Sequence, residues 1–126
     1  MNITFDDHVK KRLSVLTENE AADFVLDFNH TLSRKSISQD CCGITRYRIV
    51  AVNKGKIPTF FDASIPSNFG PIYYYSWAKM YLDQDMKIRM NGPLIEIMGS
   101  GELIAPNIEI VDYRKSDVTV NATQLQ

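Results

Sequence analysis

Histidine and cysteine, the residues that most often bind metals or act as catalytic bases and nucleophiles, are scarce in this chain. The only examples are His8, His30, Cys41 and Cys42. Nucleophilic catalysis by cysteine requires a base to form the thiolate, and a histidine usually supplies it. We expect His8 on the outer face of a helix and His30 in a polar loop. The sequence therefore does not indicate a thiol hydrolase.

The chain also lacks a basic excess and a long apolar segment. Its formal net charge is −1 and its pI is about 6.1, whereas dedicated nucleic-acid or membrane-surface binders usually carry a clear basic excess. No apolar run approaches the roughly 20 residues that span a bilayer. The N-terminal sequence "MNITFDDHVKKRL" has no apolar core of a secretory signal. We therefore expect a cytoplasmic protein without nucleic-acid or membrane partners, whose cysteines stay reduced.

No internal repeat is present, and strand and helix patterns do not alternate as they do in a doubly wound nucleotide-binding fold. One amphipathic helix is predicted near the N-terminus, with Thr4 and Asp7 as a capping box. Its apolar positions recur at helical spacing: Phe5, Val9, Leu13 and Leu16. A single helical turn is predicted over residues 78–84.

Most of the remaining pattern has period two, which indicates strands. Asn91-Gly92 predicts a type I′ hairpin turn, and residues 99–101 predict a second turn. We expect a mainly β, α+β fold whose short, mostly antiparallel strands form a sandwich or small barrel with one or two short helices. Residues 1–113 are predicted to form the domain and residues 114–126 a polar C-terminal tail. The predicted strands cover residues 22–28, 45–52, 59–65, 72–77, 86–91, 94–98 and the last part of 102–113.

Aromatic and acidic groups offer weaker indications. The run Tyr73, Tyr74, Tyr75 and Trp77 resembles a platform on which bases stack, but it lacks the interleaved Lys and Arg of such sites. We expect Tyr73, Tyr75 and Trp77 to pack in the core and on sheet faces, and exposed members of the run to serve a subunit interface. The acidic pairs read as capping or solvated groups, and the segment 83–85 lacks the spacing of a calcium loop.

Adjacent cysteines in "SQDCCGITRYRIV" (38–50) are the most unusual feature. Neighbouring side chains of an extended segment point to opposite faces, so Cys41 and Cys42 cannot both be buried as core filler. A disulfide between them would be strained, which leaves a redox pair as one interpretation. Thiolates also select zinc, Cu(I) and iron–sulfur clusters. Such sites usually have four protein ligands, so further ligands must come from a second subunit, a small thiol or non-cysteine groups.

Residues 1–113 resemble the HesB-like family of A-type iron–sulfur carriers, also called the iron–sulfur biosynthesis core domain. The likeness rests on the order of a short strand, a helix, the strand "DFVLDF" and the turn Cys41-Cys42-Gly43, followed by Tyr47 and "RIVAV". The segment "MYLDQDMKIRMNGPLIEIMGSGELIAPNIEI" resembles the second half of the family. Family members carry a C-x-G turn, so Cys41 takes a ligand position and Cys42 the variable one. Typical carriers hold two further cysteines near the C-terminus, and this chain has none after Cys42.

The resemblance implies a non-enzymatic protein of iron–sulfur cluster assembly. We expect Cys41 to bind iron or a cluster transiently, with Cys42 beside it in the cofactor site, at the subunit interface of a homodimer. The implied partners are iron–sulfur assembly proteins or apo-recipient proteins. The alternative is a metal-free, degenerate member that acts as a protein-interaction module, and a third interpretation is a thiol redox sensor.

Overall fold

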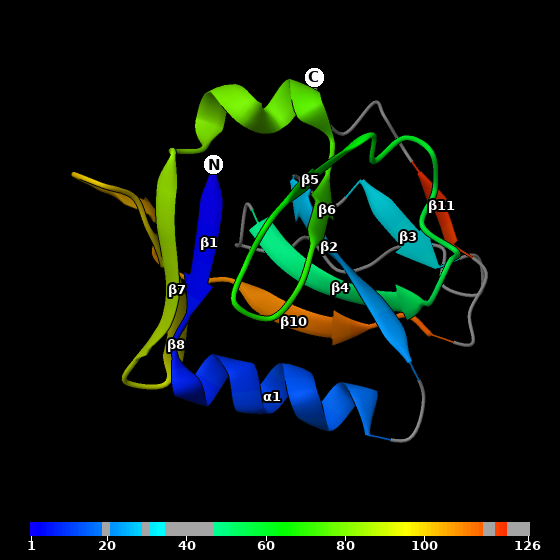
Figure 1. Ribbon diagram of the computed structural model, residues 1–126, viewed down its shortest axis with the longest axis horizontal. Coiled ribbons are helices and arrows are strands. Elements are labelled where there is room, and N and C mark those ends of the chain that lie inside the picture. The colour runs from blue at the N-terminus through cyan, green and yellow to red at the C-terminus, as the bar shows by residue number, and fades with distance from the viewer. Residues whose placement is uncertain (19–20, 29–30, 35–46, 115–117, 121–126) are drawn as a thin grey trace.

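The computed structural model describes residues 1–18, 21–28, 31–34, 47–114 and 118–120 (Figure 1). Within these ranges it contains one α-helix, one 3-10 helix and eleven short strands. The elements are β1 (Asn2–Phe5), α1 (Asp7–Thr17), β2 (Ala22–Phe28), β3 (Leu32–Arg34), β4 (Tyr47–Asn53), β5 (Ala63–Ile65), β6 (Ile72–Tyr74), η1 (Ser76–Tyr81), β7 (Asp85–Asn91), β8 (Leu94–Met98), β9 (Leu103–Ala105), β10 (Glu109–Asp112) and β11 (Val118–Val120).

Two open, mixed sheets and a small two-stranded sheet form the architecture. Their strand orders are β1-β7-β8-β9, β10-β4-β2-β6-β5 and β11-β3, and none of the described strands closes a barrel. Most neighbouring strands are antiparallel, but β1–β7, β10–β4 and β2–β6 pair in parallel. The predicted β-rich α+β fold is confirmed. The sequence pattern does not predict the parallel pairs, because they join strands that lie far apart in the sequence.

The main core lies between the two large sheets and α1, which runs along the edge shown at the bottom of Figure 1. The helix contributes Val9 and Leu13, which are spaced four residues apart and are fully buried, while Lys11 and Arg12 remain exposed. Burial of each such side chain stabilises the fold by about 1.5–3 kcal/mol before entropic costs are counted. The sheets contribute Ile3, Phe5, Phe24, Leu26, Ile49, Ile72, Met86, Ile88, Ile95 and Ile97, among others.

The start of α1 differs from the predicted capping box. Phe5 belongs to β1 rather than to the helix, and Asp6, not Thr4, is the N-cap. One carboxylate oxygen of Asp6 accepts the Val9 N–H at 2.8 Å, and the other accepts the Met90 N–H at 2.8 Å. Asp6 thereby satisfies an unpaired donor of the helix and also joins α1 to the end of β7.

The β7–β8 hairpin is confirmed, but its turn is not type I′. Asn91 pairs with Leu94, so Gly92 and Pro93 form the loop, and Gly92 has a φ of 61°. Type I′ requires positive φ at both central residues, and the proline ring holds φ near −65°. A type II′ turn, with glycine first, fits both residues.

Two predicted strands are shorter than expected, and the tail contains one more. Of residues 59–65 only β5 forms a strand, and of residues 72–77 only β6 does. Trp77 lies instead in η1, whose start is held by Asp62 through the backbone and side chain of Ser76. The predicted polar tail after residue 113 includes β11, which pairs with β3.

Replacing Asp6 should destabilise the fold in proportion to the acceptors that are lost. We expect Asp6→Ala to lower the free energy of unfolding by about 2 kcal/mol and Asp6→Asn, which keeps one oxygen acceptor, by about 1 kcal/mol. Asp7→Ala removes the neighbouring exposed acid and should cost only a few tenths, about 0.3 kcal/mol. Urea unfolding measures all three, and equal losses for Asp6→Ala and Asp7→Ala would contradict the assigned cap.

Candidate functional site

The predicted ligands Cys41 and Cys42 lie outside the described residues, as does His30. The strands on either side of their segment are described: β3 ends at Arg34, and β4 begins at Tyr47. The candidate site is therefore built from these two strands and from the side chains that hold them in place.

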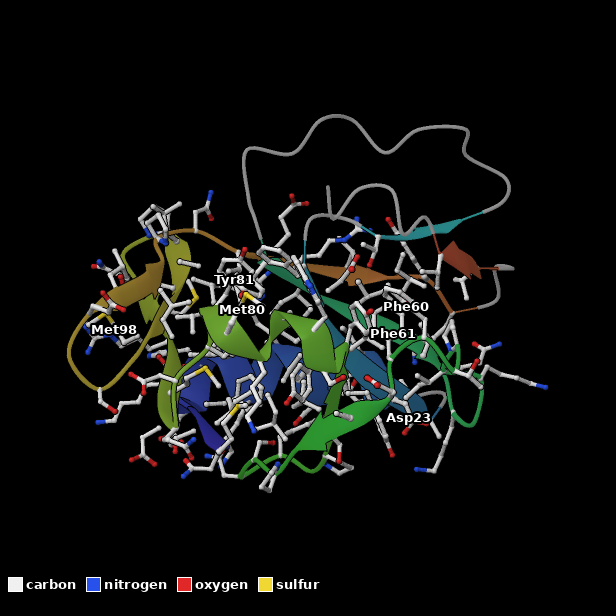
Figure 2. All side chains as sticks on the ribbon, turned by 90° about the horizontal axis from the view of Figure 1, so that it is seen from above. Asp23, Phe60, Phe61, Met80, Tyr81 and Met98 are labelled. Atoms are coloured by element: carbon white, nitrogen blue, oxygen red, sulfur yellow. The ribbon has the colours of Figure 1, made fainter. Side chains whose placement is uncertain are left out.

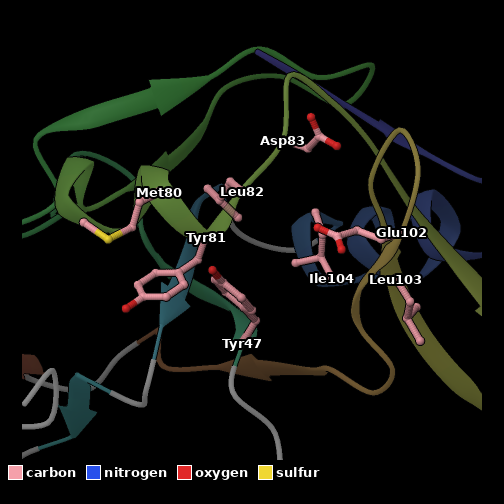
Figure 3. A pocket seen from close by; sticks show the side chains of 8 residues that line it. All are labelled: Tyr47, Met80, Tyr81, Leu82, Asp83, Glu102, Leu103 and Ile104. Carbon is pink, nitrogen blue, oxygen red and sulfur yellow. The ribbon is translucent and has the colours of Figure 1, made fainter.

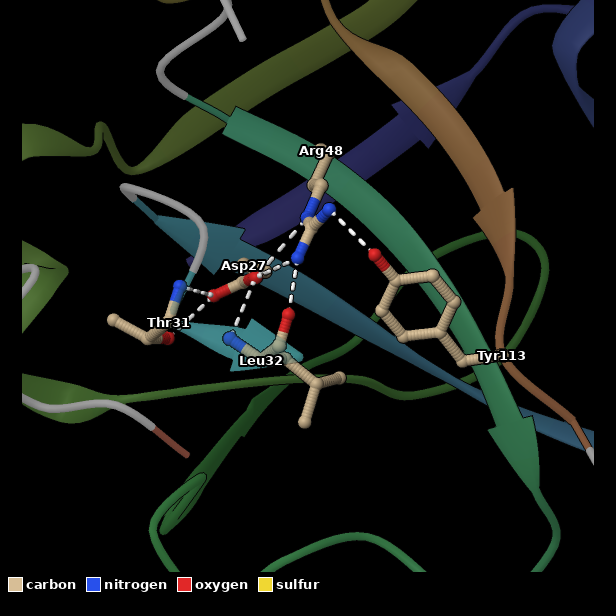
Figure 4. A network of polar contacts seen from close by, with 5 residues as sticks. All are labelled: Asp27, Thr31, Leu32, Arg48 and Tyr113. Atoms are coloured by element: carbon tan, nitrogen blue, oxygen red, sulfur yellow. Dashed lines mark hydrogen bonds and ion pairs between the residues drawn. The ribbon is translucent and has the colours of Figure 1, made fainter. Parts of the chain in front are cut away.

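A buried carboxylate stands at the centre of this frame. Asp27, near the end of β2, is fully buried and accepts hydrogen bonds from the backbone N–H groups of Thr31 and Leu32, each at 3.1 Å (Figure 4). The Thr31 hydroxyl donates to the same carboxylate. Arg48 completes the shell, with its Nη2 3.1 Å and its Nε 3.2 Å from Oδ2 of Asp27. Asp27 thus joins β2, β4 and the start of β3.

Arg48 extends the network to two further parts of the chain. It is 2% exposed, and besides Asp27 it donates to the Leu32 carbonyl and, at 2.8 Å, to the Tyr113 hydroxyl. A guanidinium carries five N–H donors in a planar fork, so one arginine can satisfy all three acceptors. The contact with Leu32 places the beginning of β3 beside the beginning of β4. The described flanks of the cysteine-bearing segment are therefore fixed relative to each other and to the core.

The protonation state of Asp27 depends on its burial and on the donors that surround it. Burial raises the pKa of Asp27, because the ionised form loses its hydration, and the donors from Thr31, Arg48 and Leu32 offset part of that rise. A carboxyl whose pKa is higher in the folded state than in the unfolded state favours folding at low pH, and this contribution is lost as pH rises through the folded pKa. Acidification alone is therefore not expected to break the network at Asp27.

A pocket of about 420 Å³ opens at the first residue of β4. Figure 3 shows its lining, with Tyr47 and Tyr81 on one side and Glu102, Leu103 and Ile104 on the other. Tyr47 lies five positions after Cys42, a distance along the chain that reaches at most about 18 Å when fully extended. The remaining lining residues are Met80, Leu82 and Asp83.

Asp83 holds the turn at one edge of this pocket. Its carboxylate accepts the Ser100 N–H and the Gln84 N–H, each at 2.8 Å. These two backbone bonds, that from Ser100 first, lower the pKa of Asp83. A Cβ added at Gly99 would lie 2.7 Å from a carboxylate oxygen of Asp83, so a side chain at that position would displace the carboxylate that holds the turn.

The aromatic run has a different arrangement from the one predicted. Tyr74 is the buried member, while Tyr73 and Tyr75 are partly buried against the second apolar cluster, which packs around Val25 and Val50. Trp77 is 38% exposed, which contradicts its predicted core position.

Exposed apolar side chains gather on η1. Figure 2 shows Met80 and Tyr81 at one end of η1 and Phe60 and Phe61 beyond its other end. Met80 is 67% exposed and Tyr81 is 42% exposed. The Tyr81 ring stacks on Phe28, with centroids 5.0 Å apart, so η1 presents an aromatic surface that is anchored in β2.

The described residues do not themselves form a metal site. They contain no group of three or more His, Cys, Asp and Glu side chains placed to hold a metal ion. His8 is exposed on α1, and the predicted acidic pairs hold a helix start and a turn. Soft-metal ligands from this chain would therefore be the thiolates of Cys41 and Cys42, for which metal binding stays a prediction. In the part of the chain that the structure describes, no helix is long and apolar enough to cross a membrane.

Comparisons with known proteins agree with the sequence resemblance. The family model for iron–sulphur cluster biosynthesis matches residues 1–112. Among solved structures, a candidate Fe-S biosynthesis protein from Lactobacillus salivarius, described as having a novel fold, is 29% identical, with a TM-score of 0.76 over 91% of this chain and 100% of that one. A candidate Fe-S biosynthesis protein from Lactobacillus acidophilus shares the fold at 17% identity, with a TM-score of 0.63 over 89% and 90% of the two chains. No curated protein matches the chain.

Removal of Arg48 should be far more harmful than removal of an exposed arginine. Arg48→Met leaves the Asp27 carboxylate buried without its charge partner, which typically costs about 3–5 kcal/mol of unfolding free energy. Adding Asp27→Asn to Arg48→Met removes the stranded charge, so the double variant should be at least ~1 kcal/mol more stable than Arg48→Met alone. Arg12→Met, on the exposed face of α1, is the control. Urea unfolding tests the order, and a double variant weaker than Arg48→Met would contradict it.

Asp83 should contribute stability at neutral pH that disappears in acid. Its pKa lies below the ordinary value of 3.8 in the folded state, so its contribution is complete above that value and is lost as pH falls through the folded pKa. We expect Asp83→Asn to melt below wild type at pH 7 and the gap to narrow at pH 3. Asp7→Asn shows the effect of removing one surface charge. A gap of equal size at both pH values would contradict the assignment.

Proposed function

Because the chain belongs to the iron–sulphur cluster biosynthesis family, we propose that it is a non-enzymatic carrier or assembly protein that binds iron or a cluster transiently. The observation that carries this proposal is the family match over residues 1–112, since that range includes Cys41 and Cys42, the only two thiols of the chain. The likeness to the L. salivarius structure over its full length supports the same assignment.

Cys41 is proposed as the metal ligand, with Cys42 beside it in the same site. A thiolate is the ligand that iron–sulfur clusters select, and a cluster is usually held by four of them. Two cysteines therefore leave the ligand set of one chain incomplete. We propose that the missing ligands come from the second subunit of a homodimer or from a small thiol. An incomplete set suits cargo that is passed on rather than retained.

The buried network supports this role by positioning the two strands that flank the cysteine-bearing segment in the sequence. Arg48 joins the start of β3 to the start of β4 through Leu32, and Asp27 ties both to β2. Thiolate ligands act together only when their chain is held in a suitable place, and rigid flanking strands restrict where that place is. The contacts of Asp27 and Arg48 thus fix the two strands at which the cysteine-bearing segment begins and ends.

The proposed partners follow from the cargo. Iron–sulfur assembly proteins would deliver iron or a cluster, and apo-recipient proteins would accept it, in the cytoplasm. The exposed side chains of Trp77, Met80 and Tyr81 provide an apolar surface of the kind that protein partners use.

The same surface supports the alternative function. A degenerate member that has lost its metal would retain a partner surface while its thiols became dispensable. The sequence has no cysteine after Cys42, and the exposed aromatic residues of η1 remain. Iron uptake separates the two functions, because only the carrier requires Cys41.

Anaerobic reconstitution with ferrous iron and sulfide tests the carrier role. We expect the wild type to take up iron and to absorb visible light, and Cys41→Ser to lose most of both, because the family ligand position is empty. Cys42→Ser is the matched control and should retain at least about half of the iron, since Cys42 occupies the variable position. Iron is counted by a chelator assay, and absorption is recorded across the near-ultraviolet and visible range, in which thiolate-bound clusters absorb.

Two outcomes would reject the proposal for this chain. Equal iron in wild type and Cys41→Ser shows that the thiol is not a ligand. Iron uptake no greater than that of a Cys41→Ser/Cys42→Ser double variant favours the metal-free interaction module.

A further inference from the structure

The described residues that line the pocket beside Tyr47 carry charge of only one sign. Its carboxylates are Asp83 and Glu102, and none of the described residues that line it is basic. Asp83 is anionic at neutral pH, because two backbone N–H groups stabilise its charged form. The whole chain has a net charge of only −1, so the two carboxylates are a local concentration of negative charge rather than part of an acidic protein. Charge complementarity therefore favours a cationic occupant.

Aromatic and aliphatic surfaces accompany these carboxylates. The Tyr81 ring stacks on Phe28 with an interplanar angle of 20° and contacts Trp77 at a tilt, while the residue as a whole is 42% exposed. Leu103, which lines the opposite side, is 46% exposed, and Met80 extends beside Tyr81 (Figure 3). A pocket that offers an aromatic face, carboxylates and aliphatic walls suits a side chain with an apolar stem and a flat cationic head.

We propose that this pocket binds a cationic side chain of a partner protein, with arginine preferred over lysine. The aliphatic stem of the arginine would lie along Leu103, and its guanidinium would stack on Tyr81 and donate to Glu102. A guanidinium is planar and forked, so it stacks on an aromatic ring and bridges to a carboxylate at the same time, which an ammonium does less well. The volume of about 420 Å³ lies within the range of about 300–1,000 Å³ typical of ligand pockets.

The site is independent of iron and goes beyond the proposed function. Exposed Met80 and Leu103 at its rim would contact the residues that flank the arginine in the partner. Because Tyr47 also lines the pocket and begins β4, a partner held there would lie close to the strand that follows the cysteine-bearing segment. Partner recognition and metal binding therefore depend on different side chains, so a substitution can abolish one of them and leave the other intact.

Titration of the metal-free protein with short peptides, followed by 1H–15N NMR, tests the site. The probe is acetyl-Leu-Arg-Leu-amide, and its neutral isostere acetyl-Leu-citrulline-Leu-amide is the matched control. We expect the arginine peptide to shift the amide signals of Tyr81, Leu103 and Ile104 and to bind at least 5-fold more tightly than the citrulline peptide. Glu102→Gln should weaken the arginine peptide at least 3-fold, while Glu18→Gln, at the end of α1, should leave its affinity unchanged.

The remaining outcomes overturn the assignment. Equal binding of the arginine and citrulline peptides shows that the pocket does not read charge, and shifts confined to other residues show that it is not the site. If acetyl-arginine amide binds as tightly as the tripeptide, the pocket takes a free small cation rather than a partner segment. Glu102 is exposed, so its substitution should preserve the fold, and the dispersion of the NMR spectrum confirms this before affinities are compared.

Discussion

The ion pair between Asp27 and Arg48 places two opposite charges in the interior of the protein, where both side chains are almost fully buried. Each charge is acceptable there only because the other is within 3.2 Å and because Thr31, Leu32 and Tyr113 satisfy the remaining polar atoms. The five residues come from β2, the residue before β3, β3 itself, β4 and the residue that follows β10. A shift of any one of these elements would leave a buried polar or charged group without a partner. The network therefore favours this one arrangement of the five-stranded sheet over alternative arrangements, besides stabilising it.

Tyr47 and Arg48, which are adjacent in β4, contact different parts of the site. Neighbouring side chains of a strand point to opposite faces, and here Arg48 faces the polar network while Tyr47 faces the main core and the pocket. The first two residues after the cysteine-bearing segment thus connect it to both features. Ordering of the strands, binding of a partner and binding of metal would therefore meet at the start of one strand, although each depends on different groups.

The sequence predicts local elements better than their partners. The alternation in residues 86–98 and the spacing of Val9 and Leu13 identify a hairpin and a helix, because those patterns arise from contacts between near neighbours. The parallel pairs join residues 48, 61 and 83 positions apart, as in Phe24 with Ile72, Arg48 with Glu109 and Asn2 with Asp85, and no local pattern reveals such pairings. Asp27 and Arg48 carry opposite charges, and each interrupts an otherwise mostly apolar strand. This pattern is the feature of the sequence from which the buried ion pair could have been predicted. The roles of Cys41 and Cys42 remain predictions from the family resemblance.

The parallel pairing of β1 with β7 has a consequence for the order in which the chain folds. Asn2 bonds to Asp85 across 83 positions, so β1 has no neighbour in its sheet until β7 exists. At a synthesis rate of roughly 5–20 residues per second, the N-terminal strand waits on the order of 4–16 s for that neighbour. Its apolar residues Ile3 and Phe5, and the face of α1 that packs beside them, cannot reach their final core contacts with β7 before that strand is made. The half-made protein thus carries an open, apolar strand during translation, when molecular chaperones act and when premature association with other chains is easiest.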